Sequence, residues 1–227
     1  MYWNYESDTC RPIGSAQNGN PISRAGYPTQ SGAYLRATNA TSDFTLVELD
    51  DPVADYINAY WSGWDRSDGN ANRSVTIHHP QGDEKRISFD NDPTTITSYL
   101  QYSVPGNGSH FRIGSWDVGT TEGGSSGAPL FNQNHHIIGQ LHGGYAACGN
   151  NESDWCGRLH KSWTGQGTNT TRLSNWLDPI NSGVMFLDGL DPSQPPPPPP
   201  INNYLLSVNK VGSGSGTVTS SPTGINC

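Results

Sequence analysis

Residues 121–144 read TEGGSSGAPLFNQNHHIIGQLHGG and join a glycine-rich loop to two short apolar runs. The loop contains the pattern Gly-x-Ser-Gly-x-Pro over residues 124–129. Attack of a serine on a peptide carbonyl creates an oxyanion, which two backbone N–H groups aimed at one point can stabilise. Glycines beside the serine let the backbone turn sharply and let a substrate approach closely. The stretch therefore predicts Ser126 as a nucleophile, and a plain Gly/Ser surface loop is the alternative.

Short runs with the composition of β-strands recur on both sides of this loop. Punctuation by Gly, Asn, Asp or Pro predicts nine strands, at Phe44–Leu49, Tyr56–Trp61, Ser74–His79, Lys85–Phe89, Thr97–Val104, His110–Val118, Ala128–Phe131, His135–His142 and Arg158–Trp163. A helix is expected only at Thr171–Leu177, where Leu173, Trp176 and Leu177 share a face and Pro179 follows. Many short strands and one late helix predict an all-β antiparallel barrel or sandwich.

Composition narrows the class of protein. The chain has 227 residues with 27 Gly and 17 Pro, and its formal net charge of −8 argues against a nucleic-acid partner. No apolar run approaches the roughly 20 residues that a membrane span needs. Only three lysines occur, and this composition suggests a secreted, extracellular protein, although no signal peptide is visible after Met1. We expect a monomer that acts on protein or peptide substrates.

A proline run divides the chain. Residues 195–200 are six consecutive prolines, which favour a stiff, extended spacer. We therefore expect a main domain over residues 1–192, a proline-rich linker over 193–201, and the start of a β-rich module over 202–227. That last piece is too short to bury a core alone.

Three further features accompany the loop. Asp43 enters an apolar strand, where an ordinary turn residue is the alternative interpretation. Gly143 and Gly144 end a strand, and a flat glycine edge suits the pairing of an extended substrate. Asp154 places a carboxylate just before another predicted strand.

The order Asp43, then Gly-x-Ser-Gly-x-Pro, resembles chymotrypsin-type serine proteases, and bacterial lysyl endopeptidases in particular. The resemblance extends from residue 2 to about residue 191, through the stretches YWNY, ATSDFTLVEL, SGWDRSD, IHHPQGDEKRIS, TEGGSSGAPLF, IIGQLHGG, SDWCGR and SWTGQGTNTTRLSNWLDP. It implies a chymotrypsin-like double antiparallel β-barrel with a C-terminal helix, in which the first barrel is incomplete here.

The resemblance also implies roles for single residues. Ser126 resembles the nucleophile and Asp43 the aspartate that orients the catalytic histidine, while the N–H groups of Gly124 and Ser126 would form the oxyanion hole. Asp154 resembles the acid that pairs with a substrate lysine. His142 matches a histidine beside the triad. Tyr102 falls where the family carries a tryptophan stacked near that histidine.

One part of the pattern is missing. In this family the order is histidine, aspartate, serine, but no histidine precedes His78 in this sequence. A structural or surface role is the better interpretation for His78, His79, His110, His135, His136 and His160, which leaves His142 as the one candidate base near the site.

We therefore expect a secreted serine endopeptidase that cleaves after lysine, or arginine, represented by a chain truncated at both ends and inactive alone. The alternative is a non-catalytic pseudo-protease that binds basic peptides.

The chain contains four cysteines. Cys10, Cys148, Cys156 and Cys227 match no metal motif, so disulfides are the better interpretation. In the family, the cysteines that match Cys10 and Cys148 pair with partners near the N-terminus that are absent here. A bridge between Cys148 and Cys156 is the remaining hypothesis. No metal and no organic cofactor is implied.

Overall fold

The computed structural model describes residues 1–12, 14–16, 19–193 and 212–214. The chain divides into two units, Met1–Pro195 and Pro196–Cys227. The predicted linker and C-terminal module lie outside the described residues, apart from Ser193 and residues 212–214. Within the described part of the chain, no helix is long and apolar enough to cross a membrane.

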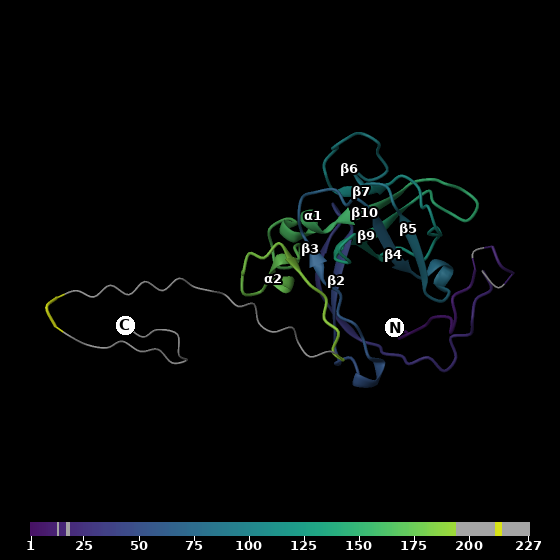
Figure 1. Ribbon diagram of the computed structural model, residues 1–227, viewed down its shortest axis with the longest axis horizontal. Coiled ribbons are helices and arrows are strands. Elements are labelled where there is room, and N and C mark those ends of the chain that lie inside the picture. The colour runs from purple at the N-terminus through teal and green to yellow at the C-terminus, as the bar shows by residue number, and fades with distance from the viewer. Residues whose placement is uncertain (13, 17–18, 194–211, 215–227) are drawn as a thin grey trace. The chain divides into compact units, whose positions relative to one another are not determined.

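The first unit is built from short strands (Figure 1). A two-stranded hairpin consists of β1 (Ala33–Asn39) and β2 (Phe44–Leu49). The larger sheet has nine strands, of which seven follow the order β5-β4-β8-β9-β10-β7-β6. These are β5 (Arg86–Asp90), β4 (Ser74–His78), β8 (Pro129–Asn132), β9 (Ile137–Gly144), β10 (Asp154–Arg158), β7 (His110–Ile113) and β6 (Thr95–Thr97). The short strands β3 (Trp64–Asp65) and β11 (Phe186–Leu187) pair beside β9.

Every pairing along the main path of the sheet is antiparallel. Two short helices, α1 (Leu159–Thr164) and α2 (Ser174–Leu177), follow the last of these strands. The all-β class with helices late in the chain is therefore confirmed, and the arrangement is consistent with the chymotrypsin-like fold.

Two apolar clusters hold the unit together. One lies within the large sheet and includes Phe111, Ile113, Leu130 and Leu141, each at most 3% exposed. The other joins the β1–β2 hairpin to the late helices, because Ala37 and Phe44 belong to the same cluster as Leu159, Trp163 and Leu173. The hairpin is thus packed against the large sheet by way of α1.

Several predicted elements are correct and three are wrong. Strand β2 has the predicted bounds, and β4, β5, β8 and β9 lie within two residues of theirs at each end. The run Tyr56–Trp61 is not a strand, because a 3-10 turn (Asp55–Ile57) ends at Asn58, whose φ is +51°. Only the first residue of Thr97–Val104 is in a strand.

Arg158–Trp163 forms helix α1 after its first residue, with Leu159 and Trp163 buried one turn apart. The predicted helix Thr171–Leu177 is confirmed only over Ser174–Leu177. Strand β1 and most of β10 were not predicted.

Candidate active site

The nucleophile loop, Thr121–Gly127, leads into β8. Gly124 and Gly127 have φ values of +94° and +84°, which a residue with a side chain rarely adopts. At Gly124 a Cβ atom would also lie 3.1 Å from the Gln81 nitrogen. Ser126 is exposed at the tip of the loop, and its Oγ donates to the carbonyl oxygen of His142 at 3.3 Å. The glycines therefore present the hydroxyl of Ser126 to solvent.

The predicted oxyanion donors are available. The N–H groups of Ser125, Gly127 and Ala128 donate to backbone carbonyls of Glu122, Leu141 and Ser125 respectively. Within residues 19–193, by contrast, no hydrogen bond uses the N–H of Gly124 or of Ser126. These two N–H donors belong to exposed residues on either side of Ser125, and one of them is the amide of Ser126 itself.

Asp43 reaches the same area from the β1–β2 turn. Its φ is +52°, a left-handed conformation that aspartate tolerates better than most residues. The side-chain amide of Gln140, on β9, donates to the carbonyls of Ser42 (2.7 Å) and Asp43 (3.2 Å). Asp43 Oδ2 lies 3.4 Å from Nε2 of His142. The turn is therefore held on β9, and its carboxylate faces an imidazole of that same strand.

The His142 ring is held on two other sides. Tyr99 stacks on it, with ring centroids 3.6 Å apart and an interplanar angle of 6°. His110 Nε2 lies 3.0 Å from His142 Nδ1, and Ser109 Oγ lies 2.7 Å from His110 Nδ1. Burial, with a smaller contribution from His142, lowers the pKa of His110 to about 4, so His110 is neutral at physiological pH.

These contacts show whether the His142 imidazole is placed to accept the proton of the Ser126 hydroxyl. The Ser126 hydroxyl contacts the backbone carbonyl of His142, and the imidazole faces Asp43 and His110 instead. Among the described residues, no imidazole hydrogen-bonds to Ser126 Oγ. His142 thus lies beside Asp43 rather than between Asp43 and Ser126.

Tyr102 does not stack on His142. Its ring makes an edge contact with Trp155, at a centroid distance of 5.7 Å, and the Arg112 guanidinium lies 5.0 Å from its centre. A strand over Thr97–Val104 would hold Tyr99 and Tyr102 on one extended segment, so the sequence did not show that Tyr99 is the residue that stacks on His142. In the structure the chain leaves β6 at Thr97 and turns at Leu100, where φ is +54°. It is therefore Tyr99, three residues before Tyr102, that stacks on the histidine.

Asp154 begins β10 and is 1% exposed. Its Oδ2 accepts hydrogen bonds from Trp116 Nε1 at 2.8 Å and from the Thr121 hydroxyl. Burial raises the pKa of Asp154, and these hydrogen bonds only partly oppose it. In the described part of the chain no cation pairs with this carboxylate. A buried carboxylate in this state gains from a ligand that carries positive charge.

Gly143 and Gly144, at the end of β9, pair with the start of β10. Gly144 pairs with Asp154, and a Cβ there would lie 2.6 Å from Asp154 Oδ1 and 2.4 Å from the Ser153 carbonyl oxygen. Strand β8 pairs with β9 only as far as Gln140. Beyond that point, residues 142–144 have β10 on one side and no strand among the described residues on the other. The glycine edge is therefore open toward the nucleophile loop.

The sequence model of the family "Lysyl endopeptidase, C-terminal domain" matches residues 1–157. The chain belongs to this lysyl endopeptidase family. A lysyl endopeptidase of Pseudomonas aeruginosa is 29% identical over 153 residues, which make up 65% of this chain. That match covers 30% of the relative, so the chain spans less than a third of its length.

A solved structure also shows a weak likeness. It is an inactive serine-to-alanine mutant of Rv3671c from M. tuberculosis H37Rv, with 16% sequence identity and a TM-score of 0.35. The match covers 56% of this chain and 58% of that chain.

The predicted disulfide is wrong. Cys148 is exposed, Cys156 is buried in β10, and both thiols are free, as is that of Cys10. Burial raises the pKa of Cys156 well above that of an ordinary thiol, and Asp154 adds to the effect. Cys227 lies outside the described residues. The described residues contain no cluster of three His, Cys, Asp or Glu side chains that could hold a metal ion.

Proposed function

We propose that this lysyl endopeptidase chain provides the nucleophile, the oxyanion hole and the lysine pocket of a serine endopeptidase that cleaves after lysine. The observation that carries the proposal is Asp154. Its carboxylate is buried with no cation beside it among the described residues, and Asp154 pairs directly with Gly144 of the open glycine edge. A substrate lysine is the ligand whose charge offsets the cost of burying this carboxylate.

In the proposed reaction, Ser126 Oγ attacks the carbonyl carbon of the substrate lysine. The serine proton passes to a histidine oriented by Asp43, and the negative oxygen accepts hydrogen bonds from the N–H groups of Gly124 and Ser126. The histidine then protonates the leaving amine, and water hydrolyses the acyl-enzyme. Because no imidazole of the described residues contacts Ser126, we assign the base to a histidine that this sequence does not contain. An extracellular setting stays a prediction.

Reaction with a fluorophosphonate tests the catalytic part, because only an activated serine reacts quickly. The chain is compared with the same chain joined at its N-terminus to the preceding segment of the Pseudomonas aeruginosa relative. We expect Ser126 to be labelled in the joined protein and labelling to disappear in Ser126→Ala. The chain alone should label no faster than Ser126→Ala. Equal labelling of the chain alone and the joined protein would show that a base is already present and contradict the assignment.

The second candidate is a peptide-binding protein without catalysis. The contact of Ser126 Oγ with a carbonyl instead of an imidazole favours it. Both functions predict binding of a peptide that ends in lysine, and only the protease predicts labelling of the joined protein. A series of peptides ending in lysine, arginine or norleucine then shows whether Asp154 accepts both cations.

A further inference from the structure

A buried histidine lies directly beneath the nucleophile loop. His78 is the last residue of β4 and is 1% exposed. Its Nδ1 lies 2.8 Å from Ser125 Oγ and its Nε2 lies 3.1 Å from Ser88 Oγ. Burial lowers the pKa of His78 to about 4, with smaller contributions from His79 and Arg86. The ring is therefore neutral at physiological pH, with one N–H donor and one acceptor.

The neighbouring hydrogen bonds decide which nitrogen carries the proton. Ser88 Oγ donates its only proton to the Thr120 carbonyl oxygen at 3.0 Å. It must therefore accept from His78 Nε2–H, which leaves Nδ1 as an acceptor for the Ser125 hydroxyl. Ser125 Oγ in turn accepts from the Glu122 N–H at 3.3 Å. Each group in this chain of hydrogen bonds has a partner of the right kind.

These hydrogen bonds join the two ends of the nucleophile loop through the His78 ring. His78 connects Ser125 to Thr120 by way of Ser88, so it ties together the two ends of the segment that carries the nucleophile. Ser125 lies between Gly124 and Ser126, the two residues whose N–H groups are free to bind an oxyanion. A displacement of Ser125 would therefore turn both donors.

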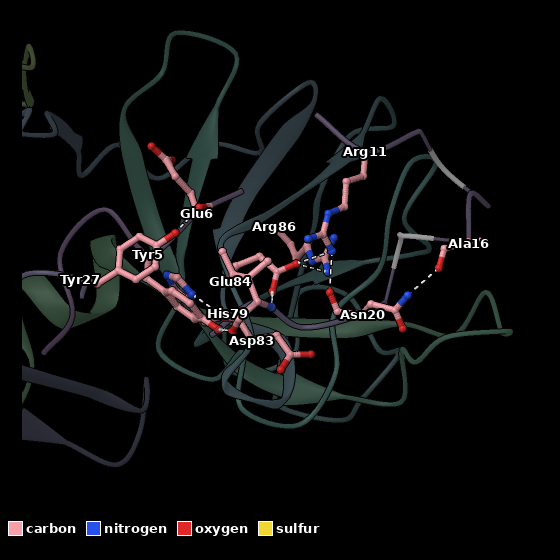
Figure 2. Close-up of polar contacts among 11 residues, drawn as sticks. Tyr5, Glu6, Arg11, Ala16, Asn20, Tyr27, His79, Asp83, Glu84 and Arg86 are labelled. Carbon is pink, nitrogen blue, oxygen red and sulfur yellow. Dashed lines mark hydrogen bonds and ion pairs between the residues drawn. The ribbon is translucent and has the colours of Figure 1, made fainter. Parts of the chain in front are cut away.

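The turn after β4 holds the loop at a second point. The 3-10 turn Pro80–Gly82 donates the Gln81 N–H to the Gly123 carbonyl oxygen at 2.7 Å. Two residues after this turn, Glu84 is fully buried between Arg11 and Arg86 and accepts the Ile22 N–H at 3.1 Å (Figure 2). Loop, turn and N-terminal segment thus form one connected support.

We propose that His78 is a positioning residue that fixes the oxyanion hole through Ser125. This inference rests on the proposed function only in naming the N–H groups of Gly124 and Ser126 as oxyanion donors. The loop geometry itself can be measured without any ligand. The proposal differs from a core-filling role because it depends on one particular nitrogen of the ring.

Two substitutions of His78 distinguish the contact made by Nδ1 from the contact made by Nε2. In His78→Gln the amide reaches about as far as Nε2, so the contact with Ser88 can be kept and that with Ser125 is lost. In His78→Asn the amide reaches about as far as Nδ1, so the contact with Ser125 can be kept. Ser125→Ala removes the same contact without altering the core histidine. His136→Asn changes another buried histidine, bonded to Asp188 at 2.8 Å, and controls for general loss of stability.

Amide hydrogen exchange of residues 122–128 in the full chain is the first measurement. We expect exchange about tenfold faster in His78→Gln and Ser125→Ala, the effect of about one hydrogen bond. The change should be about threefold or less in His78→Asn and in His136→Asn. Equal acceleration in His78→Gln and His78→Asn, or none in Ser125→Ala, would overturn the proposal.

Peptide binding is the second measurement. Two peptides that end in lysine are compared, one with a free C-terminal carboxylate and one with a C-terminal amide. Only the first places a negative charge at the oxyanion donors. We expect His78→Gln to reduce the preference for the carboxylate about tenfold and to leave the preference for lysine over norleucine unchanged. Loss of both preferences together would overturn the positioning role. If neither peptide binds the unaltered chain while the exchange results are as expected, the proposed function fails and the positioning role stands.

Discussion

In the proposed active site, the side that carries Ser126 and the side that carries Asp43 are held in different ways. Ser126 lies on the loop that leads into β8, and Asp154 begins β10 of the large sheet. The side chains that support them are buried and hydrogen-bonded: Ser125 and His78 for the loop, Trp116 and Thr121 for Asp154. Asp43 stands on a two-stranded hairpin, with its side chain 44% exposed. The lysine-binding side of the proposed active site is therefore held by the large sheet itself, whereas the aspartate depends on a few contacts with β9, β10 and α1.

The largest expected effects come from two glycines, one for each side. A Cβ at Gly157 would lie 1.8 Å from the Ser42 carbonyl oxygen, so Gly157→Ala should displace the hairpin. Gly144→Ala should instead displace β10 at Asp154. Each substitution should cost about 3 kcal/mol of unfolding free energy, measured by urea denaturation. Hydrogen exchange should show Gly157→Ala loosening residues 39–46 and Gly144→Ala loosening residues 153–156. The same regional pattern in both variants would contradict the comparison.

Acid should weaken the nucleophile side through His78. Its folded pKa of about 4 lies below its ordinary value of 6.5, so the unfolded chain binds a proton first as the pH falls. The stability that comes from neutral His78 is complete above pH 6.5 and is lost between pH 6.5 and 4. Since one pKa unit corresponds to 1.36 kcal/mol, this loss is about 3 kcal/mol.

His78→Asn isolates this loss from other titrations, such as that of Asp90, whose raised pKa of about 6 acts in the opposite direction. Between pH 6.5 and 4, unfolding free energy should fall about 3 kcal/mol more in the unaltered chain than in the variant. The negative charge of Glu122 raises the pKa of His78 and so opposes part of the shift that burial causes. Parallel pH profiles for the two proteins would show that His78 does not titrate as described.

On the hairpin side, Gln140→Leu should have a smaller effect. It removes both hydrogen bonds to the Ser42 and Asp43 carbonyls and leaves the buried Ser42 oxygen without that donor. We expect a loss of about 2 kcal/mol, by denaturation, and faster exchange in the β1–β2 turn. Exchange in residues 122–128 should not change. If those residues loosened as well, the two sides would not be independent.

The smallest effect distinguishes two tyrosines. Tyr99→Ala should remove the ring stacked on His142 and cost about 1 kcal/mol. NMR of the His142 ring should show a changed chemical shift in Tyr99→Ala and an unchanged one in Tyr102→Ala. A shift in Tyr102→Ala alone would restore the original prediction for that residue.

The sequence and the structure agree best where the pattern is local. The glycines of residues 124–127 specify a turn by themselves, and the composition of residues 44–49 specifies a strand. The helix α1 was missed because six residues are too few to separate a period of two from a period of 3.6. Leu159 and Trp163 are four residues apart, which is the helical signal that was present.

The remaining features depend on contacts between distant residues. In the sequence, His78 is only one of several histidines with a structural or surface role, and its contact with Ser125 appears only when β4 pairs with β8. His110 and Gln140 likewise acquire their partners from β9 and from the β1–β2 turn. No spacing along the chain encodes such pairs, since they depend on how the strands are ordered in the sheet.

The affinity of the chain for two peptides that differ only in their last residue, lysine or norleucine, tests the central claim most directly. Calorimetry at neutral pH should show binding of the lysine peptide about a hundredfold tighter, because its ammonium pairs with the buried Asp154 carboxylate. Asp154→Asn should abolish this preference and leave binding of the norleucine peptide unchanged. Equal affinity of the unaltered chain for the two peptides would contradict the assignment of Asp154 as the lysine-binding acid.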